Sequence, residues 1–169
     1  AYNEEKLIGR VLATMPGFVD RVIVVDDAST DQTAELVKDE QPRLRERLRL
    51  IRHERNAGVG AAIITGYKAA IFEGDDRDLV VVMAGDAQMD PEDLPRLLLP
   101  LAREQADYTK GNRLFTGEAW RIIPRTRYLG NAVLSLLTKG ASGYWHVADS
   151  QSGYTAITVA ALKGLQLDR

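Results

Sequence analysis

Residues 21–37 read RVIVVDDASTDQTAELV. The β-branched run that opens this stretch is typical of a strand that is buried on both faces of a parallel sheet. The strand ends at two adjacent carboxylates, Asp26 and Asp27, and a helical pattern follows them. The stretch therefore predicts one strand–turn–helix unit with an acidic turn between its two elements.

The order of strand, polar turn and helix occurs three times along the chain. In the first unit, Ser29 and Gln32 predict a capping box at the start of a helix that continues to Glu40. The expected strands cover residues 21–25, 48–51 and 79–83, an amphipathic helix covers 3–15, and further helices cover 61–72 and 92–103. This alternation predicts a doubly wound, parallel sheet with its ligand crevice at the carboxyl ends of the strands.

The second part of the chain has a less regular pattern. We expect a short strand at residues 107–111, a helix at 125–137 and a segment rich in Gly and Ser up to Gly153. Residues 1–169 are expected to form a single catalytic domain. Because the chain begins in a loop and stops without an obvious terminus, we expect it to be an excerpt of a longer protein.

The composition limits the classes of function. The 169 residues are 45% hydrophobic and carry a formal net charge of −2, so no basic field is available to hold a nucleic acid. The chain has no cysteine, which excludes thiolate metal sites and favours a hard cation held by oxygen ligands. No apolar run approaches the roughly 18 residues that cross a bilayer.

The turn after the third expected strand reads GDAQMDP, residues 85–91. Its alternating residues Asp86, Gln88 and Asp90 would project to one side of an extended segment and could converge on one ion. Oxygen ligands suit Mg²⁺ or Mn²⁺, which would neutralise a diphosphate leaving group. Asp90 also precedes Pro91, so a helix N-cap is the alternative role for this residue.

Three other features have two interpretations each. Gly58 and Gly60 lack the third glycine of a dinucleotide fingerprint, and they indicate a tight turn with close backbone approach to a ligand. Asp27 is either an acceptor for a nucleotide base or ribose, or a residue that turns the chain. Asp149, which precedes Gly153, is either a general base or a loop-forming residue. His53 and His146 show no ligand spacing and are interpreted as structural.

A cationic cluster lies in the less regular part of the chain. It consists of Lys110, Arg113, Arg121, Arg125 and Arg127. Arginine binds phosphate oxygens with two parallel hydrogen bonds, so a phosphate-bearing ligand is a reasonable partner, although surface charge is the default for each residue. Arg113 and Arg127 are the preferred phosphate contacts.

Taken in order, these stretches resemble the inverting glycosyltransferase family 2, and within it the polyprenyl-phosphate sugar transferases similar to dolichyl-phosphate mannose synthase. The resemblance rests on the Asp86 turn and on residues 1–5, 25–31, 56–62, 110–113 and 149–154. It implies a GT-A fold, with a Rossmann-like, mixed and mainly parallel sheet whose N-terminal strand would precede Ala1. The family often has an aspartate where this chain has Ala84, so the ligand set of the ion departs from the family pattern.

The resemblance also implies roles for individual residues. The residues expected to contact the nucleotide sugar are Tyr2, Glu4, Asp26, Asp27, Gly58 and Asp86. The expected metal ligands are Asp86, Gln88 and Asp90, and the catalytic candidates are Asp149, Arg113 and Arg127. Of these, Arg113 and Arg127 would meet the phosphate of the acceptor.

The leading hypothesis is transfer of a hexose from a UDP- or GDP-sugar to a polyprenyl phosphate or another cell-envelope glycan acceptor, with inversion and metal assistance. We expect the protein in the cytoplasm, with the cytoplasmic face of the membrane as an open alternative. A sugar-1-phosphate nucleotidyltransferase and a non-catalytic nucleotide-sugar-binding module are the other two hypotheses. A phosphate acceptor needs no strong base, so Asp149→Asn separates transfer to phosphate from transfer to a sugar hydroxyl.

Overall fold

The computed structural model describes residues 1–111 and 153–167. Its first part contains α1 (Ile8–Ala13), β1 (Val22–Asp26), α2 (Thr33–Asp39), α3 (Gln41–Leu44), η1 (Arg45–Arg47), β2 (Leu48–Arg52) and α4 (Val59–Glu73). Its second part contains β3 (Leu79–Val82), η2 (Pro91–Asp93), α5 (Leu94–Ala102), β4 (Tyr108–Lys110), β5 (Thr155–Thr158) and α8 (Val159–Lys163). All three expected strand–helix units are present, with boundaries within a few residues of the expected ones.

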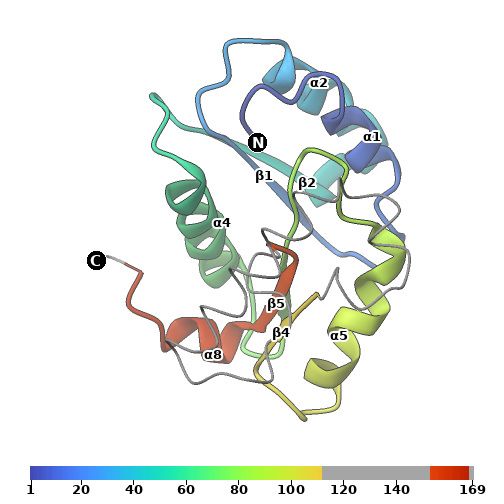
Figure 1. Cartoon of the computed structure of the whole chain (residues 1–169), viewed down its shortest axis with the longest axis vertical. Coiled ribbons are helices and arrows are strands. Elements are labelled where there is room, and N and C mark those ends of the chain that lie inside the picture. Colours follow the sequence, from blue (N-terminus) through green and yellow to red (C-terminus); the bar gives the residue numbers. More distant parts are fainter. Residues whose placement is uncertain (112–152, 168–169) are drawn as a thin grey trace, which may run out of the picture.

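The strands form one parallel pair and one antiparallel group. β1 and β2 are parallel and in register from Val22 opposite Leu48 to Asp26 opposite Arg52. β5 lies between β3 and β4 and is antiparallel to both. α1 and α2 lie on one side of the β1–β2 pair and α4 lies on the other (Figure 1). The expected doubly wound α/β architecture with a mixed sheet is confirmed, and its antiparallel part comes from β5.

The first residue of the chain extends the parallel pair. The nitrogen of Ala1 donates to the carbonyl of Val25 at 2.7 Å, and the amide of Asp27 donates to the carbonyl of Ala1 at 2.8 Å. These two bonds are one rung of a parallel ladder on β1. The loop that follows Ala1 is therefore fixed at the carboxyl end of β1, beside the acidic turn.

The expected helix over residues 3–15 is wrong in its first half. Asn3 has a left-handed φ of 54°, and α1 begins only at Ile8. The backbone amides that would start a helix are instead held by side chains of the turn after β1. The amide of Asn3 donates to Ser29 Oγ at 2.9 Å, and that of Glu4 donates to Thr33 Oγ1 at 2.8 Å. The left-handed φ of Asn3 is incompatible with a helix that starts there, and these side-chain acceptors hold the loop in its non-helical conformation.

The predicted capping box at Ser29 is wrong for the same reason. The Ser29 hydroxyl accepts from Asn3 and donates to Asp26, so it caps no helix. α2 begins four residues later, at Thr33, where the Asp31 carboxylate accepts from the Thr33 amide at 3.0 Å. The sequence pattern is therefore that of a turn which binds the N-terminal loop.

Two hydrophobic clusters support the strands. The first joins α1, α2 and the β1–β2 pair, and its buried members are Ile8, Leu12, Val24, Val37, Leu44 and Leu48. The second lies between α5 and the β3–β5–β4 group, and its buried members are Leu94, Leu97, Leu101, Tyr154 and Ala156. The spacing of three and four residues along α5 places its leucines on one face, as expected for an amphipathic helix.

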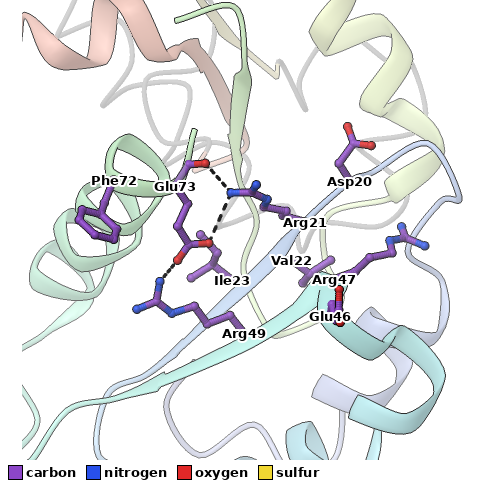
Figure 2. Close-up of a pocket in the computed structure, with 9 residues that line it drawn as sticks. All are labelled: Asp20, Arg21, Val22, Ile23, Glu46, Arg47, Arg49, Phe72 and Glu73. Atoms are coloured by element: carbon purple, nitrogen blue, oxygen red, sulfur yellow. Dashed lines mark hydrogen bonds and ion pairs between the residues drawn. The ribbon is translucent and has the colours of Figure 1, made fainter. Parts of the chain in front are cut away.

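The hollow in Figure 2 lies at the amino ends of β1 and β2, away from the acidic turns. It is lined by Asp20, Arg21, Val22, Ile23, Glu46, Arg47, Arg49, Phe72 and Glu73. Glu73, the last residue of α4, forms ion pairs with Arg21 and Arg49. The Arg21 guanidinium also donates to the Glu73 carbonyl at 2.6 Å. These contacts tie the end of α4 to both strands, which gives the charged groups a structural role.

Gly74, which ends α4, is expected to tolerate no side chain. A Cβ at this position would lie 2.6 Å from the carbonyl oxygen of Ala70 and 3.0 Å from Asp78 Oδ2. We predict that Gly74→Ala lowers the free energy of unfolding by about 1–3 kcal/mol, because the backbone must shift to relieve the overlap. Urea denaturation followed by circular dichroism measures the change.

Gly9→Ala is the matched control for this substitution. Gly9 lies inside α1, and a Cβ there would meet no atom within 4 Å. It is expected to stabilise the protein by up to about 1 kcal/mol, because alanine favours the helix over glycine. Equal effects of the two substitutions would contradict the steric argument.

Candidate functional site

Four polar segments meet at the carboxyl ends of the strands. Asp27 follows β1 and is bonded through its amide to Ala1, as described above. The acidic turn after β3 reaches the same place, since a Cβ on Gly85 would lie 3.4 Å from both Ala1 Cβ and Glu4 Cγ. The loop after β2 joins them through Gly58, whose amide donates to Asp27. The structure therefore brings together the predicted residues around Tyr2, Asp27, Gly58 and Asp86.

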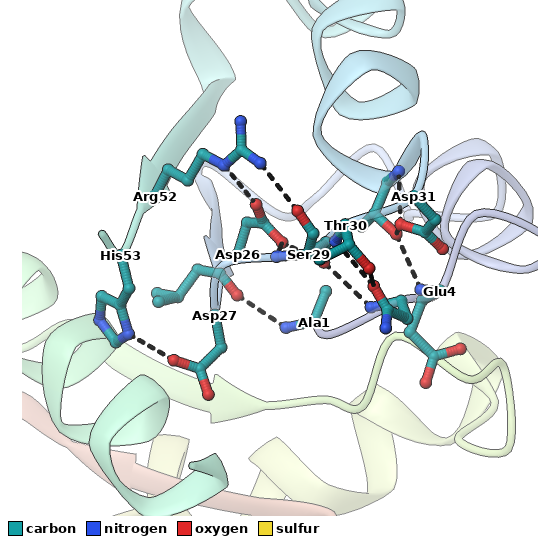
Figure 3. Close-up of polar contacts among 12 residues, drawn as sticks. Ala1, Glu4, Asp26, Asp27, Ser29, Thr30, Asp31, Arg52 and His53 are labelled. Atoms are coloured by element: carbon teal, nitrogen blue, oxygen red, sulfur yellow. Dashed lines mark hydrogen bonds and ion pairs between the residues drawn. The ribbon is translucent and has the colours of Figure 1, made fainter. Parts of the chain in front are cut away.

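The Asp27 carboxylate points toward His53 (Figure 3) and is also bound by the loop after β2. Its Oδ1 accepts from the Ala57 amide at 2.9 Å and lies 2.7 Å from His53 Nδ1, while its Oδ2 accepts from the Gly58 amide at 2.8 Å. The hydrogen bond from Ala57, followed by that from His53, lowers the pKa of Asp27 below its ordinary value. Asp27 is therefore an ionised acceptor, and it also holds the loop after β2.

Gly58 has a backbone conformation that explains why a glycine is required. Its φ of 88° and ψ of 163° are disfavoured for residues with a side chain. The chain enters α4 directly after Gly58, and the amides of Ala57 and Gly58 both donate to the Asp27 carboxylate. The expected tight turn is confirmed, whereas contact of Gly58 with a ligand stays a prediction.

The expectation that both aspartates after β1 face the crevice is wrong for Asp26. Its side chain is completely buried, accepts from the amide and hydroxyl of Ser29, and lies 3.1 Å from Arg52 Nε. Successive side chains of a strand point to opposite faces, so two adjacent carboxylates do not share one. Asp26 therefore joins β1, β2 and the Ser29 turn, whereas contact of Asp27 with a ligand stays a prediction.

The N-terminal loop adds one aromatic and one acidic side chain to the site. Tyr2 is 47% exposed, so a ligand could reach its side chain. Glu4 is half-buried beside Gly85, and its carbonyl accepts from the amides of Leu7 and Ile8 at the start of α1. Their contact with a nucleotide stays a prediction.

The acidic turn is tightly bent. Asp86 Oδ1 accepts from the Gln88 amide at 3.0 Å, and Ala87 between them has a left-handed φ of 55°. Asp90 Oδ1 accepts from the Glu92 amide at 2.9 Å, so its alternative role as a helix N-cap is confirmed. Within residues 1–111 and 153–167, no three Asp, Glu, His or Cys side chains are grouped closely enough to hold a metal ion. Binding of an ion by Asp86, Gln88 and Asp90 therefore stays a prediction.

We predict that Asp90→Ala affects stability rather than metal binding. The substitution removes the N-cap of η2, which is expected to cost about 1 kcal/mol of unfolding free energy. Calorimetry should show an unchanged effect of Mn²⁺ on nucleotide affinity, while thermal unfolding shows the loss of stability. A loss of the Mn²⁺ effect with unchanged stability would instead identify Asp90 as a ligand.

The catalytic candidates Arg113, Arg127 and Asp149 lie outside the described residues, as do the other arginines of the cationic cluster. The residues that flank this part of the chain do reach the acidic turn. The Gly111 amide donates to the Tyr154 carbonyl at 2.7 Å, and a Cβ on Gly153 would lie 3.3 Å from Met89 Cε. The chain therefore leaves and re-enters the described structure beside the turn that contains Asp86.

Sequence reasoning gave no role to Tyr154 and an unspecified structural role to His53. The Tyr154 hydroxyl donates to the Asp90 carbonyl at 3.0 Å. Burial, with smaller contributions from Asp93 and Asp90, raises the pKa of Tyr154 to about 12, so the hydroxyl remains a donor at neutral pH. His53 is the partner of Asp27. The only signal for His53 in the sequence is its place just after a strand, which is too common to assign a role.

The fold and the position of the site define a nucleotide-binding α/β protein of the GT-A glycosyltransferase class. The structure is similar to the crystal structure of glucosyl-3-phosphoglycerate synthase from Mycobacterium tuberculosis in complex with Mn²⁺ and UDP-glucose, with a TM-score of 0.70 at 23% sequence identity. The similarity covers 98% of this chain and 56% of the solved chain. At this level of identity the comparison establishes the fold.

The chain belongs to glycosyl transferase family 2, whose sequence model matches residues 1–165. It is 34% identical to a UDP-N-acetylglucosamine–dolichyl-phosphate N-acetylglucosaminyltransferase from Methanococcus voltae, over 98% of this chain and 69% of that protein. It is 30% identical to an undecaprenyl-phosphate mannosyltransferase from Micrococcus luteus, over 99% of this chain and 67% of that protein. The predicted family and its polyprenyl-phosphate branch are confirmed.

Among the described residues, no helix combines the length and the apolar character that crossing a membrane requires. The longest of them, α4, has 15 residues.

Proposed function

We propose that this chain is the donor-binding part of an enzyme that transfers a hexose from a nucleoside diphosphate sugar to a polyprenyl phosphate. The observation that carries the proposal is the meeting of Asp27, the Gly58 loop, the N-terminal loop and the Asp86 turn at one end of the strands. In open α/β sheets, nucleotides bind in this position. The names of both curated relatives, which act on dolichyl phosphate and undecaprenyl phosphate, support the acceptor class.

In this proposal the nucleoside lies between the N-terminal loop and the turn after β1. The Asp27 carboxylate accepts a hydrogen bond from the base, and the exposed ring of Tyr2 lies beside the base or ribose. Because three protein donors fix the Asp27 carboxylate, it loses little conformational freedom when it binds a ligand. Glu4 and Gly58 line the same space.

A divalent cation, Mg²⁺ or Mn²⁺, fits beside the diphosphate at the Asp86 turn. Oδ1 of Asp86 is used by the Gln88 amide, and Oδ2 makes no hydrogen bond with another described residue. One carboxylate oxygen, with the Gln88 side chain nearby, suits a cation that takes few protein ligands and completes its shell with phosphate oxygens and water. Such an ion neutralises the charge that develops on the departing diphosphate. The Mn²⁺ complex of the solved neighbour supports this assignment.

The acceptor phosphate is assigned to Arg113 and Arg127. A phosphate oxygen is a competent nucleophile near neutral pH, so direct attack on the anomeric carbon, with inversion, requires no general base. Asp149 would then orient the acceptor or its loop. A polyprenyl acceptor resides in the membrane, so we also propose that the enzyme works at the cytoplasmic face of the membrane.

Isothermal titration calorimetry of the full-length protein tests the proposal. UDP- and GDP-hexoses are titrated with Mn²⁺ and in the presence of a chelator, and turnover is then measured with a short polyprenyl phosphate. Metal-dependent binding and release of a nucleoside diphosphate are expected. Release of pyrophosphate from a nucleoside triphosphate and a sugar 1-phosphate, supplied in a separate assay, would indicate a nucleotidyltransferase. The absence of binding by every nucleotide sugar would refute the proposal.

A further inference from the structure

The turn that contains Asp86 is supported at both ends by distant parts of the chain. At its start, a Cβ on Gly85 would lie 3.4 Å from Glu4 Cγ, so the N-terminal loop packs against the backbone of the turn. At its end, the Tyr154 hydroxyl donates to the Asp90 carbonyl at 3.0 Å. The backbone is therefore held on either side of Asp86 by segments that are far from it in the sequence.

Between these two ends, the turn has an unfavourable backbone conformation. Ala87 has a left-handed φ of 55°, which a residue with a Cβ keeps only when the surrounding structure imposes it. Two local bonds close the turn, from the Gln88 amide to Asp86 Oδ1 at 3.0 Å and from the Ala84 amide to Met89 Sδ at 3.2 Å. A thioether sulfur is a weak acceptor, so the second bond adds little. The conformation that presents Asp86 therefore needs restraints from outside the turn.

Tyr154 is held rigidly in the core. Its side chain is 6% exposed and belongs to the hydrophobic cluster between α5 and the β3–β5–β4 group, against which Met89 also packs. Its backbone is fixed as well, because the Gly111 amide donates to its carbonyl at 2.7 Å. Burial raises the pKa of Tyr154 to about 12, so the hydroxyl keeps its proton at neutral pH. Tyr154 is thus a fixed donor that faces the end of the acidic turn.

The acceptor of this bond is a junction of three elements. The Asp90 carbonyl accepts from the Asp93 amide of η2 at 3.1 Å and from the Tyr154 hydroxyl at 3.0 Å. A carbonyl oxygen has two lone pairs, and these two donors use both of them. The acidic turn, η2 and the start of β5 therefore meet at one atom. Because that atom belongs to the backbone, the bond does not depend on the side chain of Asp90.

We propose that Tyr154 is a positioning residue for the metal, because its bond to the Asp90 carbonyl keeps the turn in the conformation in which Asp86 binds the cation. The inference rests on the proposed function, since it takes Asp86 as a ligand of the Mg²⁺ or Mn²⁺ ion beside the diphosphate. Tyr154 acts through the backbone and is not itself a ligand. When only a fraction of the molecules has the turn in the binding conformation, the apparent affinity for the ion falls in proportion to that fraction. Loss of the hydroxyl therefore weakens metal binding without removing a ligand.

Tyr154→Phe in the full-length protein tests the inference, because it removes the hydroxyl and keeps the ring in the core. Mn²⁺ is titrated by calorimetry at a saturating concentration of UDP or GDP, whichever binds the parent protein more tightly. The Kd for Mn²⁺ is expected to rise about three- to tenfold, which corresponds to about one hydrogen bond. The affinity for the nucleotide in the presence of a chelator should not change.

The rate of sugar transfer gives a second measurement. In Tyr154→Phe the rate should fall at limiting Mn²⁺ and recover at saturating Mn²⁺, because the ligands of the ion are still present. Measured well below Tm, a general loss of stability would not produce this recovery.

Thr109→Val is the matched control. The Thr109 hydroxyl donates to the Leu97 carbonyl at 2.7 Å, so this substitution also removes a bond from a hydroxyl to a backbone carbonyl, but it does so between β4 and α5. It is expected to lower Tm and to leave the Kd for Mn²⁺ unchanged. Asp90→Ala, which keeps the carbonyl that accepts from Tyr154, should also leave this Kd unchanged.

The possible results separate the inference from the proposed function. A Kd for Mn²⁺ that is unchanged in Tyr154→Phe, or that rises equally in Thr109→Val, would overturn the inference and leave the proposed function intact. If Mn²⁺ had no effect on nucleotide binding by the parent protein, the metal assignment of the proposed function would fail, and the inference would fail with it.

Discussion

Replacing Asp86 by asparagine is expected to lower kcat/KM for sugar transfer by about a thousandfold, or about 4 kcal/mol of transition-state stabilisation. Oδ2 of Asp86 makes no hydrogen bond with another described residue, and the turn lies against the N-terminal loop. Asparagine keeps the bond to the Gln88 amide but loses the negative charge that holds a divalent cation. The charge of the departing diphosphate would then lack its counter-ion.

Two measurements separate this effect from a disturbed fold. Thermal unfolding of Asp86→Asn should match that of the parent protein, because the bond that shapes the turn is retained. Calorimetry should show that Mn²⁺ no longer strengthens the binding of UDP. Glu92→Gln, which neutralises an exposed carboxylate six residues further on, is the control and should keep its activity. Full activity of Asp86→Asn would refute the metal assignment.

The strands and long helices could be predicted because local patterns determine them. The β-branched run of β1 and the apolar spacing of α5 are signals contained within a few residues. The first turn of the expected N-terminal helix is absent because this segment is a loop that contacts Ser29 and Thr33, which lie 26 and 29 residues from Asn3 and Glu4 in the sequence. A contact of that kind has no local periodicity, so a pattern of apolar residues cannot reveal it.

The candidate site was predicted in outline, and its details depend on geometry. The rule that ligands bind at the carboxyl ends of strands correctly brought Asp27 and the Asp86 turn together. That rule did not predict that the side chains of Asp26 and Asp27 point in different directions. Neighbouring residues of a strand point to opposite faces of the sheet, but this assigns each side chain only when one of the two faces is known. The pairing of His53 with Asp27 joins the ends of β1 and β2, and it follows from the register of the two strands rather than from either sequence alone.

Asp26 and Asp27 thus divide two tasks between adjacent residues. The Asp26 carboxylate joins β1 to β2 through Arg52, while the Asp27 carboxylate is held by His53 and by the backbone amides of Ala57 and Gly58. Substitutions at the two positions should therefore change different measured quantities. A change at Asp27 affects nucleotide binding, whereas a change at Asp26 affects the free energy of unfolding.

Asp26→Asn is expected to lower the free energy of unfolding by about 2–3 kcal/mol, which for a domain of this size lowers Tm by roughly 5–10 °C. The carboxylate is completely buried and accepts from Ser29, and an amide nitrogen in its place would face the Arg52 guanidinium as a second donor. The cost stays below that of a fully buried ion pair for two reasons. The Arg52 side chain is 49% exposed, so it can reach water when its partner is lost, and Oδ2 makes no well-aligned hydrogen bond with Nε.

A double-mutant cycle with Arg52→Met isolates the contribution of the ion pair, and urea denaturation gives each free energy. Asp20→Asn, at an exposed carboxylate just before β1, is the control and should change stability by less than about 0.5 kcal/mol. If Asp26→Asn matched this control, the buried carboxylate would contribute nothing to the junction of β1 and β2. A loss of stability with retained affinity for UDP, measured well below Tm, would instead show that Asp26 has a structural role and does not contact the nucleotide. The two aspartates can therefore be told apart by experiment, although they are adjacent in the sequence and identical in chemistry.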